Sequence, residues 1–162
     1  MNIIVAIDEN NGIGKGNELL AHICPDLKYF KETTLNKVIV MGYNTYMSLP
    51  KRPLPNRTNI VLTTKDIKLD GAIVANSLAS LLDKIREYEN NGEEVFICGG
   101  AKIYDLMIPY VNKLYVTRIK HGFDADTFFP DFKNDWKLVS TVANDENLSH
   151  KYPHEFSIYH RK

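Results

Sequence analysis

Residues 95–109 read VFICGGAKIYDLMIP, and this stretch holds one complete unit of the predicted fold. Val95–Cys98 is a short apolar run, which predicts a strand buried on both faces. The pair Gly99-Gly100 forms a turn, and the residues after it predict a helix that Pro109 ends. A strand, a glycine turn and a helix in this order are typical of α/β proteins.

The same alternation recurs before this unit. Apolar runs rich in β-branched residues predict further strands at Ile3–Ile7, Lys37–Met41, Asn59–Leu62 and Ala72–Val74. Helices are predicted from Pro25 to about Thr34, over Asn44–Leu49, and from Leu78, behind a Ser77 cap, to Asn91-Gly92. In the last of these, Leu78, Leu81, Leu82 and Ile85 follow the spacing of an amphipathic helix.

Two regions depart from this alternation. Asp8–Cys24 carries Gly12, Gly14 and Gly16 and is predicted to be a long loop, a feature that is often functional in a compact domain. Near the end of the sequence, strands are predicted at Lys113–Ile119, Trp136–Val142 and Phe156–His160. No helix separates these strands, so they should pair antiparallel or lie at an edge.

The predicted fold class is therefore α/β, with a mainly parallel central sheet, antiparallel C-terminal strands and helices on both faces. We expect residues 1–162 to form a single domain, since the sequence shows no repeat, low-complexity tract or linker.

Composition limits the classes of partner. The 162 residues are 44% hydrophobic, and 20 basic side chains balance 20 acidic ones, so no general attraction to nucleic acid or an anionic membrane is expected. Cys24 and Cys98 have neither a CxxC nor a metal-ligand spacing, so no metal site is predicted. The first residues do not resemble a signal peptide, and no apolar run is long enough to span a bilayer. We expect a cytoplasmic monomer with reduced thiols.

Asp26 is the first candidate for chemistry. In the predicted helix it shares a face with Phe30 and lies beside Leu27, at the end of the glycine-bearing loop. A carboxyl group on such an apolar face should be buried, and burial raises its pKa and suits it to proton transfer near neutral pH. The alternative is that Asp26 merely occupies the first helical turn, where the helix dipole favours a negative charge.

Three further segments suggest ligand contacts. Gly99-Gly100 lies between a strand and a helix N-terminus, an arrangement that lets a phosphate approach the backbone, although a tight turn explains the pair equally well. Thr63-Thr64-Lys65 follows a strand and offers hydroxyls and a cation, or is simply an exposed polar turn. Arg57 follows the rigid Pro53-Leu54-Pro55 and is suited to bind a carboxylate, or is an ordinary surface arginine.

Taken together and in order, these segments resemble bacterial dihydrofolate reductases over nearly the whole chain. The resemblance rests on Ala6, Asp8-Glu9-Asn10, Gly12-Ile13-Gly14, Pro25-Asp26-Leu27 with Phe30 and Lys31, Val40-Met41-Gly42, Arg52-Pro53-Leu54-Pro55-Asn56-Arg57 with Asn59-Ile60, Gly99-Gly100-Ala101 with Ile103-Tyr104, Leu114-Tyr115-Val116-Thr117, and Asp126-Thr127 before Phe129-Pro130.

The resemblance implies NADPH-dependent reduction of dihydrofolate, with a hydride from nicotinamide C4 and protonation at pterin N5 assisted by Asp26. It also implies antifolate inhibitors such as trimethoprim or methotrexate as ligands. The implied substrate-binding residues are Ile4, Val5, Asp26, Leu27, Phe30, Leu54, Arg57, which would take the glutamate α-carboxylate, and Thr117, which would brace Asp26. The implied cofactor-binding residues are Ala6, Ile13, Gly14, Leu19, Gly42, Tyr43, Asn44, Thr45, Leu62, Thr63, Thr64, Lys65, Cys98, Gly99, Gly100, Ala101, Lys102, Ile103 and Tyr104, with Thr64 and Lys65 facing the 2′-phosphate.

The sequence departs from the family pattern at three positions. Ala21 stands where the family has a tryptophan at the exit of the mobile loop, which predicts slower turnover and altered antifolate binding. Tyr43 stands where an arginine often helps to bind the 2′-phosphate, and Lys65 and Lys102 are candidates to compensate. Cys98 replaces an aliphatic residue and is interpreted as a small buried hydrophobe.

Three alternative functions have less support in the sequence. A reductase of the same fold that acts on a riboflavin precursor lacks the helical acid, so Asp26 and Arg57 disfavour it. A family member that binds folate and NADPH without turnover draws its support from the missing tryptophan. A structural module leaves the ordered polar residues at the strand ends unexplained.

Overall fold

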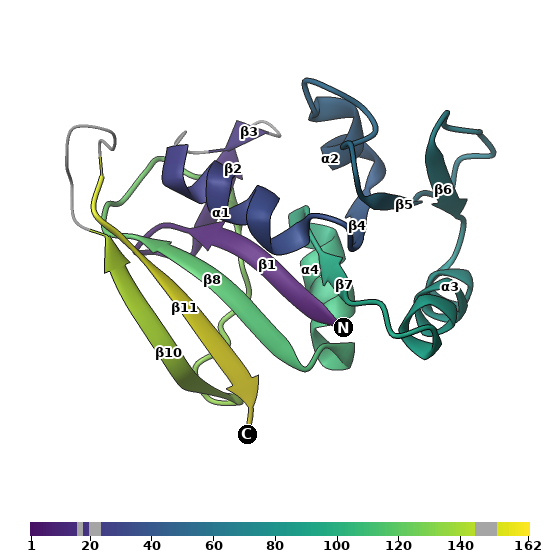
Figure 1. Cartoon of the computed structure of the whole chain (residues 1–162). Helices are drawn as coiled ribbons and strands as arrows, with labels where there is room; N and C mark the ends of the chain where they lie inside the picture. Colours follow the sequence, from purple (N-terminus) through teal and green to yellow (C-terminus); the bar gives the residue numbers. More distant parts are fainter. Residues whose placement is uncertain (16–17, 20–23, 145–151) are drawn as a thin grey trace.

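The computed structural model describes residues 1–15, 18–19, 24–144 and 152–162, without the side chains of residues 15, 18–19, 24–27 and 144. Its framework is an eight-stranded sheet in the order β10-β11-β8-β1-β7-β4-β5-β6 (Figure 1). The strands of this sheet are β1 (Asn2–Ile7), β4 (Val38–Gly42), β5 (Thr58–Leu62), β6 (Ala72–Ala75), β7 (Val95–Ile97), β8 (Lys113–Ile119), β10 (Trp136–Asn144) and β11 (His154–Arg161). The helices are α1 (Cys24–Thr34), α2 (Tyr43–Ser48), α3 (Leu78–Asn90) and α4 (Ala101–Met107).

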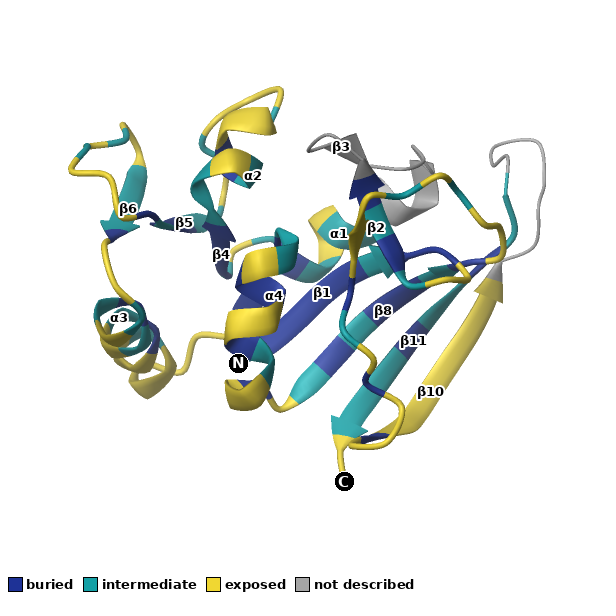
Figure 2. Cartoon of the chain, turned by 180° about the vertical axis from the view of Figure 1, so that it is seen from behind, coloured by how far each residue is buried: buried dark blue, intermediate teal, exposed yellow. Residues whose placement is uncertain are grey.

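Alternating side chains of the central strands build a core on each face of the sheet. The first core contains Ile3, Val40 and Ile97 and takes its helical residues from α3 and α4, including Leu81 and Met107. The second core contains Ile4, Ile39, Met41 and Phe96, and residues of α1 and α2 pack against it or within it. The continuous apolar runs in the sequence reflect this burial on both faces, which colours β1 mostly dark blue in Figure 2. The predicted fold class is confirmed.

Local signals set several element boundaries. The Ser77 side chain accepts a hydrogen bond from the Ser80 N–H at 3.1 Å, as predicted for a helix cap. Leu81 and Ile85 of α3 are fully buried, which confirms its amphipathic pattern. The helix predicted to reach Pro109 ends instead at Met107, because the chain tightens into a 3₁₀ turn over Ile108–Tyr110 that accommodates the proline.

The prediction of a continuous loop over Asp8–Cys24 was wrong. The segment contains β2 (Gly12–Lys15) and β3 (Glu18–Leu19), which form a small sheet with β9 (Thr127–Phe128) in the order β3-β2-β9. These strands have only two to four residues, and β9 lies more than a hundred positions after β2 and β3 in the sequence. Such short strands show no alternation of apolar and polar residues from which they could be predicted. Asp8, at the end of β1, holds this region together. Its carboxylate accepts backbone hydrogen bonds from Gly12 at 2.7 Å and Phe123 at 3.0 Å.

The C-terminal strands pair in a mixed manner. β11 runs antiparallel to both β8 and β10, as predicted for this part of the chain. β8 is also parallel to β1 along its other edge, which the antiparallel prediction missed. The physical reason is that α4 precedes β8 and serves as the crossover that a parallel connection requires.

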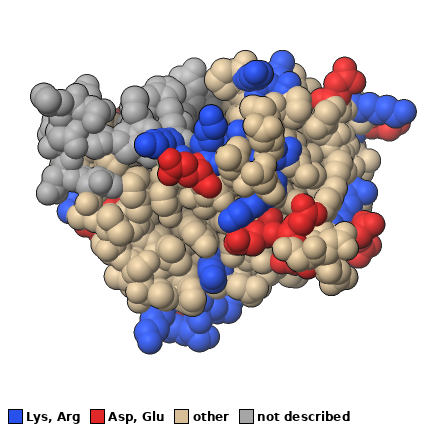
Figure 3. Space-filling model, in the orientation of Figure 1, with Lys and Arg blue, Asp and Glu red and all other residues tan. Residues whose placement is uncertain are grey.

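Two surface properties accompany this fold. No helix within the described residues is long and apolar enough to cross a membrane. On the face drawn in Figure 3, basic and acidic side chains are interspersed, in keeping with the equal number of each in the sequence.

Candidate active site

The carboxyl ends of the parallel strands bring most of the predicted site residues to one edge of the sheet. β8, β1, β7, β4 and β5 are neighbours in this order and run in the same direction. Ala6 pairs with Thr117 across β1 and β8, and Gly42 pairs with Leu62 across β4 and β5. Ligands of open α/β sheets bind at this edge, because the loops that leave the strand ends surround a crevice there.

The glycine pair after β7 packs closely against its neighbours. Gly99 has φ +119°, and its carbonyl accepts a hydrogen bond from the Gly42 N–H at 2.9 Å. A Cβ on Gly100 would lie 3.2 Å from Thr45 Oγ1, and one on Gly42 would lie 3.0 Å from Ile103 Cγ1. Larger residues would therefore crowd the space between β4, β7 and the start of α4. Glycine at these positions allows the two strand ends and the helix to pack closely.

The segment after β5 is held by the side chain of Asn76, the residue that follows β6, and by the Thr63 hydroxyl. Asn76 donates from Nδ2 to the carbonyl oxygens of Thr63 at 2.8 Å and Lys65 at 2.9 Å. Thr63 Oγ1 accepts from the Lys65 N–H at 3.2 Å. Thr64 and Lys65 are exposed, whereas Thr63 is buried. The segment thus presents two polar side chains to solvent from a fixed backbone.

A second group of predicted residues gathers around Arg57. Its Cζ lies 6.0 Å from the centroid of the Phe30 ring, and its Nη1 donates to Thr34 Oγ1 at 3.3 Å. Phe30 and Leu54 are both partly buried and pack against the second core. A helix and a proline-rich loop therefore supply an apolar surface with one guanidinium beside it.

Electrostatics mark this region as suited to an anionic group. Burial lowers the pKa of Arg57, and no carboxylate among the described residues forms an ion pair with it. Burial raises the pKa of the Cys98 thiol from 9.0 to about 12, against the lowering effect of the Arg57 charge and of a backbone hydrogen bond from Val40. Cys98 is thus a neutral thiol at physiological pH, which agrees with its interpretation as a small hydrophobe.

The remaining predicted site residues differ in burial and in their hydrogen bonds. Tyr104 is buried and donates from its hydroxyl to the Ile4 carbonyl at 2.9 Å. Thr117 is buried at 2% exposure, and Ala6 is partly exposed. Gly14 is buried, and its carbonyl accepts hydrogen bonds from the Asp126 N–H and the Thr127 hydroxyl. Val5 and Ile103 belong to the first core, and Ile13 and Leu62 pack against it. Tyr43 packs against the second core. Ala101 is the first residue of α4, and the side chains of Asn44 and Lys102 are exposed.

The residue that carries the predicted chemistry lies in the first turn of α1. Asp26 and Leu27 belong to this helix, and Leu19 pairs with Gly14 in the small sheet. The side chains of these three residues lie outside what the structure describes, as does Ala21 altogether. The predicted burial of the Asp26 carboxyl group and the effect of the missing tryptophan therefore stay predictions.

Asn59 is a residue whose role the sequence analysis missed. It is 1% exposed, and its Nδ2 donates to the carbonyl oxygens of Leu54 at 3.0 Å and Arg57 at 3.1 Å. It thereby fixes the loop that carries two predicted substrate contacts. The available signal was an amide at the start of an otherwise apolar strand, since a buried polar side chain must find partners. The sequence analysis also missed Asn76, because this residue follows a strand and precedes Ser77, where a polar residue is not unusual.

Comparison with known proteins now decides the family. The family model described as dihydrofolate reductase matches residues 1–161. The chain belongs to the dihydrofolate reductase family. The dihydrofolate reductase of Bacillus subtilis is 41% identical over 100% of this chain and 95% of its own length. That of Buchnera aphidicola from Acyrthosiphon pisum is 38% identical over 99% of each chain. The structure of the Enterococcus faecalis dihydrofolate reductase complexed with NADP(H) and RAB-propyl has a TM-score of 0.90 at 37% identity, and the match covers 99% of this chain and 95% of that one.

The assignment to the dihydrofolate reductase family confirms the resemblance and the enzyme class predicted from sequence. The described residues also fit the dinucleotide that such a reductase uses. A Cβ on Gly100 would meet only Thr45 Oγ1 within 4 Å among the described residues, so the backbone at the start of α4 is accessible to a phosphate. Lys65 offers a cation after the end of β5, two strands away from β7. Among the described residues there is no cluster of acidic, histidine or cysteine side chains that would hold a metal ion.

Proposed function

We propose that the protein reduces dihydrofolate to tetrahydrofolate with NADPH, and that Asp26 assists protonation at pterin N5. The proposal is supported by membership of the dihydrofolate reductase family and by the polar and glycine residues gathered at one edge of the sheet. The single observation that carries the folate side is the position of Arg57, a guanidinium without a carboxylate partner among the described residues, beside the ring of Phe30. This arrangement suits an aromatic ligand that ends in a carboxylate.

The residues of the chain position the reactants and manage one proton. When bound, NADPH supplies the hydride from nicotinamide C4. A Cβ on Gly100 would meet only Thr45 Oγ1 within 4 Å among the described residues, so the backbone there can be approached by the dinucleotide, and Ala6 lies near the partly exposed end of β1. Phe30, Leu54 and Arg57 bind the substrate, and Thr117 braces Asp26. Assistance of this kind by a positioned acid contributes about 10²- to 10⁴-fold to the rate.

The same proposal covers the setting of the enzyme. Residues 1–162 act as one dihydrofolate reductase domain, supported by a single sheet that joins strands from both ends of the chain. The protein works as a monomer in the cytoplasm, supplies tetrahydrofolate for one-carbon metabolism, and binds antifolates such as trimethoprim and methotrexate. It has no nucleic-acid or membrane partner.

The test follows the loss of NADPH absorbance in the presence of dihydrofolate, for the native protein and for Asp26→Asn. We expect turnover by the native protein, and a collapse in the variant near neutral pH that is partly reversed as the pH is lowered and the substrate becomes protonated from solvent. A native protein that binds both ligands tightly without turnover would favour the inactive binder and contradict the enzymatic proposal.

A further inference from the structure

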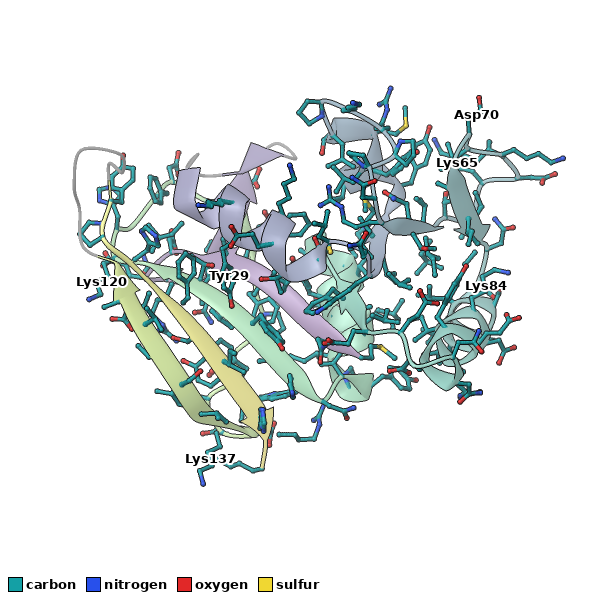
Figure 4. The ribbon with its side chains drawn as sticks, viewed as in Figure 1. Tyr29, Lys65, Asp70, Lys84, Lys120 and Lys137 are labelled. Carbon is teal, nitrogen blue, oxygen red and sulfur yellow. The ribbon has the colours of Figure 1, made fainter. Side chains whose placement is uncertain are left out.

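Tyr43 and Lys65 form a cation–π pair at the carboxyl ends of two adjacent strands. Lys65 Nζ lies 4.3 Å from the centroid of the Tyr43 ring. Tyr43 is the first residue of α2 and directly follows β4, whereas Lys65 lies three positions after the end of β5. Because Gly42 and Leu62 are paired in these strands, the two side chains leave neighbouring points of the sheet edge. Lys65 is labelled in Figure 4, between α2 and β6.

The backbone that carries Lys65 is fixed independently of this ring. Asn76 binds the carbonyl oxygens on both sides of Thr64, and Thr63 Oγ1 accepts from the Lys65 N–H. The Thr63 N–H also donates to the Ala75 carbonyl at 2.9 Å. What remains variable is the flexible four-carbon side chain of the lysine. The contact with the Tyr43 ring restricts where the ammonium group at the end of this side chain lies.

The type of partner matters for what the lysine can still bind. Within the part of the chain that the structure describes, no carboxylate forms an ion pair with Lys65, although Asp66 and Asp70 are near in sequence. A carboxylate would hold the ammonium group and also neutralise it. An aromatic face attracts the ammonium group through its quadrupole and leaves the full positive charge available to an anion.

We propose that Tyr43 is a positioning residue that presents the Lys65 ammonium group to the ribose 2′-phosphate of NADPH, so that this pair establishes the preference for NADPH over NADH. The inference rests on the proposed function, because it concerns the cofactor of that same site. It replaces the direct charge of the arginine often found at this position in the family with an indirect contribution from a neutral ring. Tyr43 then affects ligands that bear the 2′-phosphate and leaves NADH unaffected.

The experiment measures binding without turnover, by calorimetric titration of the purified protein with NADP⁺ and with NAD⁺. The variants are Tyr43→Leu, Tyr43→Phe, Lys65→Gln and the double variant Tyr43→Leu/Lys65→Gln. Lys68→Gln is the matched control, since it removes another exposed lysine three positions away. We expect the native protein to prefer NADP⁺, and Lys65→Gln to lose about tenfold or more of its NADP⁺ affinity, as for a charge-assisted hydrogen bond.

The decisive comparison is the double-mutant cycle. We expect Tyr43→Leu to weaken NADP⁺ binding about 2- to 5-fold, the range of an exposed cation–π contact, and to leave NAD⁺ binding unchanged. Tyr43→Phe keeps the ring and should retain native affinity. In the Lys65→Gln background the Tyr43→Leu change should have no further effect on NADP⁺. Equal losses for both nucleotides, or a full Tyr43→Leu effect without Lys65, would overturn the proposal.

This result is separable from the proposed function. A native protein that prefers NADP⁺ through this pair but does not reduce dihydrofolate would sustain the inference and contradict the reductase activity. A native protein that reduces dihydrofolate but binds NADP⁺ and NAD⁺ alike would do the reverse.

Discussion

The side chain of Asn59 is hydrogen-bonded twice to the backbone of Leu54. Its Oδ1 accepts from the Leu54 N–H at 3.0 Å, and its Nδ2 donates to the Leu54 carbonyl at 3.0 Å. A third bond from Nδ2 reaches the Arg57 carbonyl. One buried amide thus holds both ends of the loop from which Leu54 and Arg57 face the proposed substrate. This relationship links the interior of β5 to the site.

Replacing Asn59 should therefore damage both stability and substrate binding. Asn59→Ala leaves buried backbone groups of the loop without partners, which costs about 1–3 kcal/mol in the free energy of unfolding. We expect KM for dihydrofolate to rise while KM for NADPH changes little, because the loop carries substrate contacts. Urea unfolding and steady-state kinetics measure the two effects. Asn134→Ala, at an exposed position, serves as the control. An unchanged KM for dihydrofolate in Asn59→Ala would contradict the claim that Asn59 positions the loop for substrate binding.

Arg57 should discriminate among ligands by their carboxylates. Arg57→Gln removes a charge-assisted interaction worth about 1.5–3 kcal/mol, so binding of dihydrofolate and methotrexate, which end in glutamate, should weaken at least tenfold. Trimethoprim has no carboxylate, and its affinity should stay near the native value. Fluorescence titration with both inhibitors checks this difference. A similar loss for the two inhibitors would indicate that Arg57 shapes the pocket rather than binding a carboxylate.

Cys98 should resist alkylation in the folded protein. Its pKa of about 12 leaves almost no thiolate near neutral pH, and the thiolate is the reactive form. In a Cys24→Ser background, we expect iodoacetamide to modify Cys98 at least tenfold more slowly than free cysteine, by an order-of-magnitude estimate. Unfolding in urea should restore the ordinary rate. Mass spectrometry follows the modification, and a folded protein that reacts as fast as free cysteine would refute the prediction.

The same thiol predicts a pH dependence of stability. Its pKa is raised on folding from 9.0 to about 12, so the folded state retains the proton that the unfolded state loses between these values. The stabilising contribution is complete below about pH 9 and declines as the pH rises toward 12. The difference in unfolding free energy between the native protein and Cys98→Val should change over this window only. A difference that is constant with pH would show that the thiol does not titrate in this way.

Gly12 should tolerate no side chain. A Cβ there would lie 2.7 Å from Ala125 Cβ and 2.8 Å from Asp8 Oδ2, where Asp8 binds the backbone of Gly12 itself. We expect Gly12→Ala to cost about 1–3 kcal/mol of stability, because a fixed carboxylate and a neighbouring chain must move. Thermal unfolding measures this. Gly122→Ala is the control, since its nearest contact would be the flexible end of Glu9, and equal destabilisation of the two variants would count against the crowding argument.

Sequence reasoning was most successful where the signal is local. Continuous apolar runs such as Ile3–Ile7 predicted strands buried on both faces, and the Ser77 cap placed the start of α3 correctly. The glycine pair, Thr63-Thr64-Lys65 and Arg57 were each ambiguous alone. Parallel pairing resolved part of that ambiguity, because it brought the glycine pair and Thr63-Thr64-Lys65 to the carboxyl ends of neighbouring strands. Arg57 precedes β5 and lies at the amino ends of these strands.

The sequence by itself determined the α/β class, the strand-forming runs, the Ser77 helix cap and the candidate residues, since these depend on side chains a few positions apart. Only the tertiary structure decided that β8 lies parallel to β1, that β2 and β3 pair with β9, and that Asn59 binds the Leu54 loop. It also decided that Tyr43 meets Lys65. Such contacts join segments whose separation along the chain carries no periodic signal. They arise when burial of both faces of the sheet selects one strand order and register.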